Sequence, residues 1–214
     1  LMVLDIDASI NNVEPNYAKI KKYAAECRMP LCYGGGIKTV EQARAIIALG
    51  VEKIALSSGV LEDLSLIASL ASELGSQSVV VVLDVKRDFL GRYKVFTHNG
   101  GQATGLDLFP LISKVQEYGA GEIVINSIDR DGMSEGYDFK LARTVKDQVF
   151  VPLTFLGGAG SLNDIEKLIS ENGIIGCAAG SLFVFKGIYR AVLISYPDQM
   201  RRQEMMKRAI EQFK

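Results

Sequence analysis

Histidine, cysteine and tryptophan are scarce in this 214-residue chain, and their scarcity excludes several kinds of chemistry. One histidine, His98, lies in the segment THNGG, and there is no tryptophan. The three cysteines (Cys27, Cys32 and Cys177) have no CxxC or zinc-ligand spacing, and their odd number argues against a disulfide framework. HExxH, GxGxxG and Ser/His/Asp patterns are also absent from the sequence. We therefore predict no metal, no cofactor and a reducing compartment, with His98 on an exposed loop.

The chain also lacks an excess of charge and a long apolar run. It has 24 basic and 25 acidic residues, which gives a net charge of −1, so neither a nucleic-acid surface nor a basic membrane patch is expected. No apolar run reaches the roughly 18 residues of a membrane span, and the first residues have no basic signal-peptide region. These absences predict a cytoplasmic protein that binds neither nucleic acid nor membrane.

What the sequence does contain is a series of short apolar runs that alternate with helical segments. Continuous runs such as SVVVVLDV are typical of strands buried on both faces of a parallel sheet. Regular alternation of strand and helix predicts right-handed βαβ units and an α/β fold. The seven predicted strands are Met2–Ile6, Pro30–Tyr33, Lys53–Ser57, Ser78–Asp84, Glu122–Asn126, Pro152–Leu156 and Ile174–Ala179. The predicted helices include Val40–Leu49, Asp63–Leu74, Leu108–Tyr118, Leu162–Ser170 and a C-terminal helix within residues 196–214.

An internal repeat indicates which α/β fold this is. PLCYGGGIKTVEQ (Pro30–Gln42) aligns without gaps on PLTFLGGAGSLND (Pro152–Asp164) at an offset of 122 residues, and VLDID aligns on INSID at the same offset. Two such halves predict a single-domain (βα)8 TIM barrel over residues 1–214, with an internal half-barrel duplication. The strand Ser78–Asp84 has no earlier twin, so we expect the chain to begin at the second strand, with the first βα unit absent. The alternative is an open, doubly wound sheet of seven strands.

The C-terminal strand ends and the loops after them form the active face of such a barrel, and here they carry carboxylates, small hydroxyls and glycines. Glycine-rich turns let the backbone approach an anion, and a following helix start adds free N–H groups. GGAGS together with AAGS predicts one phosphate site, and the repeat of these segments, GGGIKT with SSG, predicts a second. Two sites indicate a substrate with two phosphates. The alternative is that the glycines only form tight turns.

Asp84 is the candidate acid or base. It ends the predicted strand Ser78–Asp84, after four valines and a leucine. A carboxyl that emerges from such an apolar wall is expected to have a raised pKa, which suits a general acid or base. The alternative is a structural role, in which Asp84 pairs with Lys86 or Arg87 or caps the next turn.

Six segments of the chain resemble one family. LDIDAS, YGGGIKTVEQA, GSQSVVVVLDVKR, THNGGQATGLD, GAGEIVINSIDRDGMSEGYD and GGAGSLNDI occur in this order and together resemble the HisF family, the cyclase subunit of imidazole glycerol phosphate synthase. The resemblance implies a lyase-type enzyme of histidine biosynthesis that forms a heterodimer with a HisH-type glutaminase. Ammonia from that partner would pass through the barrel to a bis-phosphorylated formimino-carboxamide ribonucleotide. The products would be imidazole glycerol phosphate and an aminoimidazole carboxamide ribonucleotide.

The resemblance also implies roles for particular residues. Asp84 matches one of the two catalytic aspartates of the family, and the other lies on the first strand. Lys53 and Glu122 match half of a charged ring that gates ammonia, and Glu52 matches a position that contacts the glutaminase. The residues that match substrate or phosphate contacts are Asp5, Gly36, Ser57, Ser58, Asp131, Gly132, Gly158, Gly180 and Ser181.

Four positions depart from the family pattern. Asp7 replaces a threonine, Ser57 an asparagine, Asn126 a threonine and Leu156 a serine. An added carboxylate beside a phosphate is unfavourable by on the order of 1 kcal/mol. These departures resemble the HisF-like paralogues that accompany sugar amidotransferases, so the alternative function is an ammonia-channelling partner of a glutaminase and an amidotransferase in acetamidino-sugar (surface polysaccharide) biosynthesis. The sister isomerase HisA shares the duplicated barrel, but GAGEIVINSIDRDG and LDVKR fit it less well.

Overall fold

The computed structural model describes residues 1–98 and 100–213. The chain forms two compact units, Leu1–Val124 and Ile125–Lys214. The boundary between them coincides with the sequence repeat, in which Val3 aligns with Ile125. None of the described helices combines the length and the apolar character that a membrane crossing requires.

Parallel strands that pair in chain order form the first unit. β1 (Met2–Leu4), β2 (Cys32–Gly34), β3 (Lys53–Leu56) and β4 (Val79–Arg87) are successive neighbours in the sheet. The first three residues of β7 (Glu122–Ser127) also belong to this unit, and β7 follows β4 in the strand order. Strands of a parallel sheet are covered on both faces, and accordingly the first five residues of β4 are all buried.

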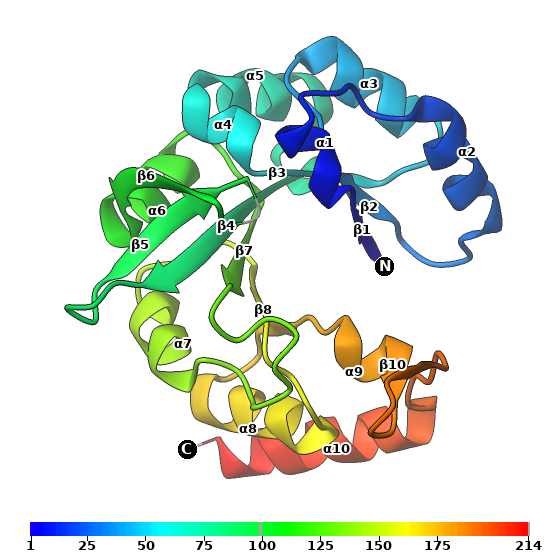
Figure 1. The fold of residues 1–214 in the computed structure, drawn as a ribbon, viewed down its shortest axis with the longest axis vertical. Helices are drawn as coiled ribbons and strands as arrows, with labels where there is room; N and C mark the ends of the chain where they lie inside the picture. The colour runs from blue at the N-terminus through cyan, green and yellow to red at the C-terminus, as the bar shows by residue number, and fades with distance from the viewer. Residues whose placement is uncertain (99, 214) are drawn as a thin grey trace. The chain divides into compact units, whose positions relative to one another are not determined.

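Helices follow these strands and bury their apolar stripes against the sheet. Ile67 and Leu70 of α5 are fully buried and lie three residues apart, the spacing that lines one helix face. Ile46 of α3 is fully buried as well. α2, α3 and α5 lie one beside the next along β1 to β4 (Figure 1). The helices of the first unit are α1 (Ile6–Ile10), α2 (Tyr17–Glu26), α3 (Val40–Ala48), α4 (Ser58–Glu62), α5 (Ser65–Leu74), a 3-10 turn at Ser76–Ser78 and α6 (Leu108–Glu117).

An antiparallel hairpin extends the first unit, and the sequence patterns did not predict it. β4 continues past Asp84 to Arg87 and pairs there with β5 (Tyr93–Thr97), which in turn pairs with β6 (Gln102–Asp107) (Figure 1). The prediction that the strand ends at Asp84 is therefore wrong. The turn explains the extension, because the Asp88 carboxylate accepts hydrogen bonds from the N–H groups of Leu90 (2.9 Å) and Arg92 (2.8 Å) and so closes the β4–β5 connection.

The second unit repeats the parallel βα pattern. The end of β7 is followed in the sheet by β8 (Leu153–Leu156) and β9 (Gly176–Cys177). β9 is shorter than the predicted strand Ile174–Ala179. The remaining elements of this unit are α7 (Phe139–Lys146), α8 (Leu162–Asn172), α9 (Ser181–Val184), β10 (Phe185–Lys186), β11 (Ala191–Val192) and α10 (Gln199–Gln212).

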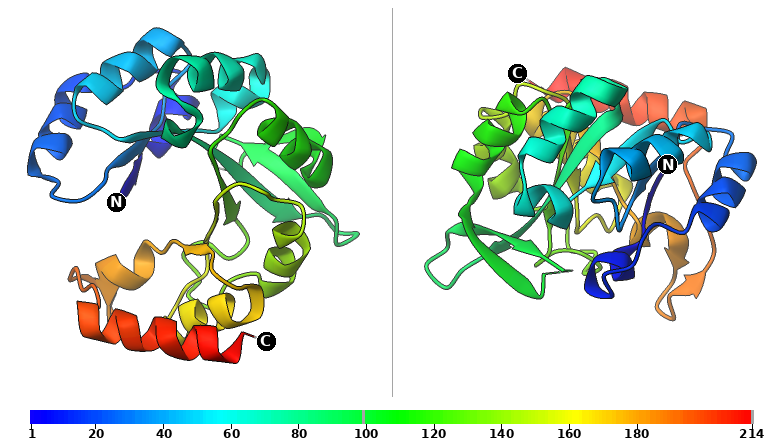
Figure 2. Two further views of the ribbon diagram at one scale, coloured as in Figure 1. Left: turned by 180° about the vertical axis from the view of Figure 1, so that it is seen from behind. Right: turned by 90° about the horizontal axis from the view of Figure 1, so that it is seen from above.

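The predicted C-terminal helix is present as α10, and it packs along α8 (Figure 2). Met205 and Ala209 of α10 are buried, and the Arg208 guanidinium holds the Glu166 carboxylate of α8 at 2.8 Å. Between α9 and α10, β10 and β11 form a second antiparallel hairpin. The sequence patterns did not predict this hairpin either.

The backbone geometry confirms the half-barrel duplication. Thr39 and Ser161 begin α3 and α8, and each completes a capping box with the residue three positions later. The two turn glycines are also equivalent. A Cβ on Gly35 would lie 2.5 Å from the carbonyl oxygen of Asp5, and one on Gly157 would lie 2.6 Å from that of Ser127. All of these pairs are related by the offset of 122 residues.

Candidate functional site

Five of the residues predicted to bind phosphate line one pocket within the second unit. The pocket is bounded by the loop after β7, the turn after β8 and the start of α9. Its wall consists of Asp131, Gly132, Ser134, Leu156, Gly157, Gly158, Ala159, Ala179, Gly180 and Ser181. The structure therefore brings together Asp131, Gly132, Gly158, Gly180 and Ser181, which lie up to 50 residues apart in the sequence.

Two glycines shape this pocket in different ways. Gly158 has φ +106, and a Cβ there would lie 2.3 Å from the carbonyl oxygen of Gly136. The N–H of Gly136 in turn donates to the carbonyl oxygen of Gly158 (2.8 Å). Only glycine allows the two loops to approach so closely. Gly180 has φ −99, and a Cβ there would meet no atom within 4 Å. Its missing side chain leaves open space at the pocket instead of relieving a clash.

The pocket offers neutral donors and one carboxylate. Asp131 is the charged residue of its wall, while Ser134 and Ser181 add hydroxyls. The Asp131 N–H donates to the Ser127 carbonyl oxygen (3.0 Å), which fixes the loop after β7. Leu156, which departs from the family pattern, lines the pocket with a half-buried apolar side chain. Hydroxyls and backbone N–H groups can bind an anion and Leu156 can contact an adjoining apolar part, whereas the Asp131 carboxylate opposes a negatively charged ligand.

The repeat places an equivalent loop arrangement in the first unit. Gly36 has φ +73, and a Cβ there would lie 2.6 Å from the Val13 carbonyl oxygen. A Cβ on Gly59 would lie 2.8 Å from the Ile37 carbonyl oxygen, so the turn after β2 runs directly beside the start of α4, where Ser57 and Ser58 lie. The Ser57 hydroxyl is buried and has no hydrogen-bond partner among the described residues.

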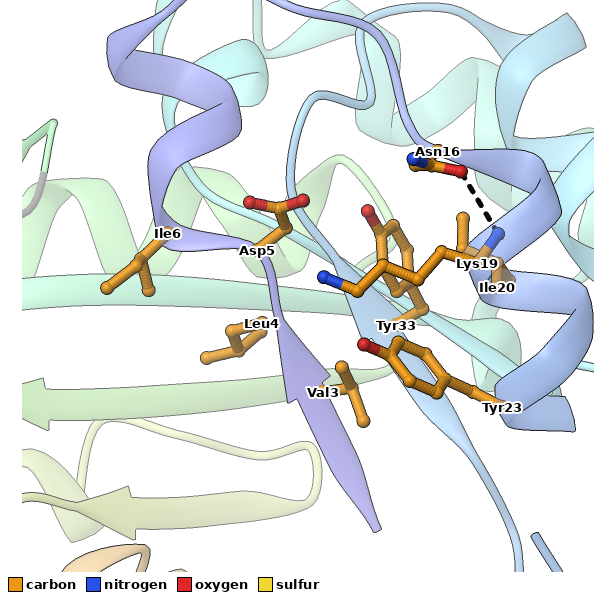
Figure 3. Close-up of a pocket in the computed structure, with 9 residues that line it drawn as sticks. All are labelled: Val3, Leu4, Asp5, Ile6, Asn16, Lys19, Ile20, Tyr23 and Tyr33. Carbon is orange, nitrogen blue, oxygen red and sulfur yellow. Dashed lines mark hydrogen bonds between the residues drawn. The ribbon is translucent and has the colours of Figure 1, made fainter. Parts of the chain in front are cut away.

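Asp5 lines a different pocket of the first unit, of about 150 Å³, between β1, β2 and α2. The Asp5 carboxylate, the Lys19 amino group and the Tyr33 hydroxyl all border it (Figure 3). Burial, and next to it the Asp5 charge, raises the pKa of Tyr33 to about 12. The backbone of Asp5 contacts the β2 strand end, since its N–H donates to Gly34 (2.8 Å). Asp5 thus adjoins the first glycine turn, since a Cβ on Gly35 would lie 2.7 Å from the Cβ of Asp5, and it also lines this pocket beside α2.

Asp84 lies inside a strand instead of at a strand end. It is half-buried and faces Phe96 of β5 in the antiparallel ladder. The pairing with β5 therefore fixes the backbone of Asp84 on that side of the strand. Its predicted role as a general acid or base, and its predicted raised pKa, remain predictions.

Lys53 and Glu122 form an ion pair with an N···O distance of 2.6 Å. They are the first residues of β3 and β7, at the opposite strand ends from the glycine turns. The Glu122 side chain is 15% exposed and that of Lys53 is 41% exposed. Burial, and secondly the Glu122 charge, raises the pKa of the neighbouring Cys32 thiol to about 12. The structure thus brings together the two residues predicted to gate ammonia.

The comparisons with known proteins decide the family. A family model described as "Histidine biosynthesis protein" matches residues 1–189. The chain belongs to this family. It is 55% identical over 199 residues to "Putative imidazole glycerol phosphate synthase subunit HisF" of Leptospira borgpetersenii, a match that covers 92% of this chain and 78% of the relative. It is 51% identical over 208 residues to subunit hisF3 of Vibrio vulnificus (97% and 80% covered) and 49% identical over 198 residues to subunit hisF2 of Pseudomonas aeruginosa (92% and 79%), both named as putative.

As a HisF-like member of this family, the chain has an α/β fold of the TIM-barrel type. The parallel strands, the helices that connect them and the two equivalent halves agree with that assignment. The open doubly wound sheet, which was the alternative from sequence, is therefore not adopted.

Two further features of this HisF-like chain concern individual residues. His98 is half-buried, not exposed as predicted, and its ring nitrogen Nδ1 lies 3.1 Å from the Thr97 hydroxyl. No group of three potential metal-ligating side chains occurs within the described part of the chain.

The sequence reasoning missed Arg190, whose guanidinium donates to the Gly132 carbonyl oxygen (3.4 Å). Gly187, with φ +72, was the available signal for the turn that carries Arg190.

Proposed function

We propose that this chain is the cyclase subunit of imidazole glycerol phosphate synthase. It uses ammonia from a glutaminase partner to convert a bis-phosphorylated formimino-carboxamide ribonucleotide to imidazole glycerol phosphate. The observation that carries the proposal is the pocket of Asp131, Gly132, Gly158, Gly180 and Ser181, all five of which match phosphate contacts of the family. Relatives of 49–55% identity that bear the name of this synthase subunit support the proposal.

The duplication supports a substrate with phosphates at both ends. Each unit has a glycine turn after its strand β2 or β8, and each turn is followed by a capped helix, α3 or α8. Backbone N–H groups at such turns bind phosphate without the need for a lysine. In this proposal Gly36, Ser57 and Ser58 bind one phosphate, and the pocket of the second unit binds the other.

The chemistry between the phosphates requires ammonia and proton transfer. In this proposal Asp84 exchanges protons with the substrate during ring closure, which a half-buried carboxylate on a rigid strand can do. Lys53 and Glu122 control the entry of ammonia from the glutaminase, and Glu52 contacts that partner. A charged pair at the strand ends opposite the glycine turns suits such a gate, because ammonia entering there is kept apart from water at the substrate side.

The test uses the full-length protein with an ammonium salt and the formimino ribonucleotide, and it measures imidazole glycerol phosphate by chromatography. We expect product with the wild type and a loss of at least 100-fold in kcat for Asp84→Asn, the order of effect of a general acid–base group. A matched control is Asp63→Asn, which changes an exposed carboxylate of the same unit. A folded wild-type protein that gives no product would contradict the proposal.

A second candidate function rests on Leu156. Its side chain lines the pocket of the second unit at a position where the family has a serine, so a hydroxyl contact to phosphate is lost. The numbered names hisF3 and hisF2 of two relatives agree with a second kind of HisF-like subunit. In this alternative the chain conducts ammonia from a glutaminase to an amidotransferase that makes an acetamidino sugar. Glutamine-dependent amidation of a nucleotide sugar only in the presence of this chain, together with no cyclase turnover, would favour the alternative.

A further inference from the structure

A phosphate bound in the pocket of the second unit would find no positively charged side chain in the pocket wall. Among its ten lining residues, all of which the structure describes, there is one carboxylate, Asp131, and no cation. A phosphate monoester carries up to two negative charges at neutral pH, so Asp131 repels it. Backbone N–H groups offset part of that repulsion. A cation at the pocket edge would remove the rest.

Arg190 is placed to be that cation. It lies in the turn of the β10–β11 hairpin, where its backbone N–H donates to the Gly187 carbonyl oxygen (3.0 Å). Its guanidinium stacks over the Phe185 ring, with 4.9 Å between the guanidinium carbon and the ring centroid, and donates through Nη1 to the carbonyl oxygen of Gly132, a residue of the pocket wall. The side chain is therefore held at the pocket edge by two contacts.

The other cations near this edge are not placed in the same way. Arg130 lies in the loop after β7, but its Nη1 donates to the carbonyl oxygen of Glu135 (3.4 Å), which is not a residue of the pocket wall. Lys186 lies in strand β10 of the same hairpin and, like Arg190, is exposed. A guanidinium has five N–H donors in a planar arrangement that matches phosphate oxygens, and one bond to Gly132 leaves four of them.

We propose that Arg190 binds the substrate phosphate in the second-unit pocket and supplies its countercharge. The inference deepens the proposed function and rests on it, since it requires that this pocket holds a phosphate monoester. The β10–β11 hairpin thereby becomes part of the substrate site: it carries the guanidinium, and the contact with Gly132 joins it to the glycine wall. Arg190 determines affinity for the phosphorylated end of the ligand and takes no part in proton transfer.

The test exploits the backbone of Arg190, whose φ is +48. Asparagine tolerates this left-handed conformation better than most residues, so Arg190→Asn removes the charge without straining the backbone. Lys186→Asn removes the same charge from the same hairpin and is the matched control. Binding of the bis-phosphorylated ribonucleotide to the full-length protein is measured by calorimetry without ammonia, at two salt concentrations, and again with the two analogues that each lack one phosphate.

We expect Arg190→Asn to weaken binding about three- to tenfold and to reduce its salt dependence, as loss of a partly exposed charge-assisted hydrogen bond does. Lys186→Asn should change the affinity less than twofold. One of the two monophosphate analogues should be insensitive to Arg190→Asn, because it lacks the phosphate that Arg190 contacts. Equal affinities of the two variants would overturn the role of Arg190 and leave the pocket intact. A wild type that does not bind the ribonucleotide would overturn the proposed function itself.

Discussion

The variant Gly180→Ala tests whether the fold requires a glycine at this position or whether the glycine leaves space for a ligand. Gly180 has φ −99 and ψ −69, which alanine adopts without strain, and a Cβ there would meet no atom within 4 Å. Alanine at such a position stabilises a protein by about 0.4–1 kcal/mol, because it restricts the unfolded chain. We therefore expect the free energy of unfolding of Gly180→Ala to be unchanged or slightly raised.

Ligand binding should respond in the opposite direction. If a phosphate approaches the backbone at Gly180, the new methyl group occupies the space that one of its oxygens needs. Loss of one charge-assisted hydrogen bond of about 1.5 kcal/mol corresponds to at least a tenfold weaker Kd. Calorimetry with the bis-phosphorylated ribonucleotide measures this loss, and urea unfolding measures the stability in parallel.

Gly158→Ala is the control variant, for which we expect a large loss of stability. Its φ is +106, and the added Cβ would lie 2.3 Å from the Gly136 carbonyl oxygen and 3.0 Å from the Cβ of Arg130. The left-handed backbone alone costs about 1–2 kcal/mol for alanine, and the backbone clash adds to it, so this variant should be destabilised by about 3 kcal/mol or more. If Gly180→Ala binds the ribonucleotide as tightly as the wild type, the reasoning that this glycine makes room for a phosphate is refuted.

Three further predictions concern stability. Lys53→Ala removes the ion pair with the Glu122 carboxylate, whose side chain is 15% exposed, and should cost about 1–3 kcal/mol, whereas the double variant with Glu122→Gln should recover part of that loss in a double-mutant cycle by urea unfolding. Thr39→Ala and Ser161→Ala each remove a capping-box hydroxyl and should each cost about 1 kcal/mol; a large inequality between them would contradict the equivalence of the two halves. The pKa of Cys32 is raised to about 12 by burial, so the unfolded thiol ionises at lower pH than the folded one and stability should fall between about pH 9 and 12; Cys32→Ala should flatten that fall, measured as the urea midpoint against pH.

The repeat and the helices could be read from the sequence because their signals are local. The capping boxes at Thr39 and Ser161 use residues three positions apart, and the turn glycines are dictated by backbone approaches within one βα unit. Since both halves show the same pattern, one half could be used to interpret the other. For the same reason the five pocket residues of the second unit were predictable together: they follow successive parallel strands, whose C-terminal ends meet at one edge.

The hairpins were not predictable, because pairing partners decide them. β6 has the sequence QATGLD, in which glycine and aspartate disfavour a strand; it is held by β5 and by the contact of Lys94 with Asp107. The direction of the Asp5 side chain was not predictable for a related reason. The alternation of side chains along a strand gives two faces, and β1 ends at Leu4, one residue before Asp5, whose carboxylate borders the pocket between β1, β2 and α2. A shift of one residue at a strand end decides which pocket a side chain lines.

The two glycine turns are equivalent in backbone but not in chemistry, and this difference gives the proposed substrate a direction. Gly34 and Leu156 occupy equivalent positions. A Cβ on Gly34 would lie 2.7 Å from the Ala55 carbonyl oxygen, whereas the full leucine side chain at 156 lines its pocket. The first turn lies beside the buried Ser57 hydroxyl, which has no hydrogen-bond partner within the described part of the chain, whereas the second lies beside an apolar side chain and the guanidinium of Arg190. The binding of a phosphate that contacts a cation in place of a hydroxyl depends more strongly on ionic strength. The two ends of a bis-phosphorylated ligand should thus differ in salt sensitivity, although the backbone that holds them is duplicated.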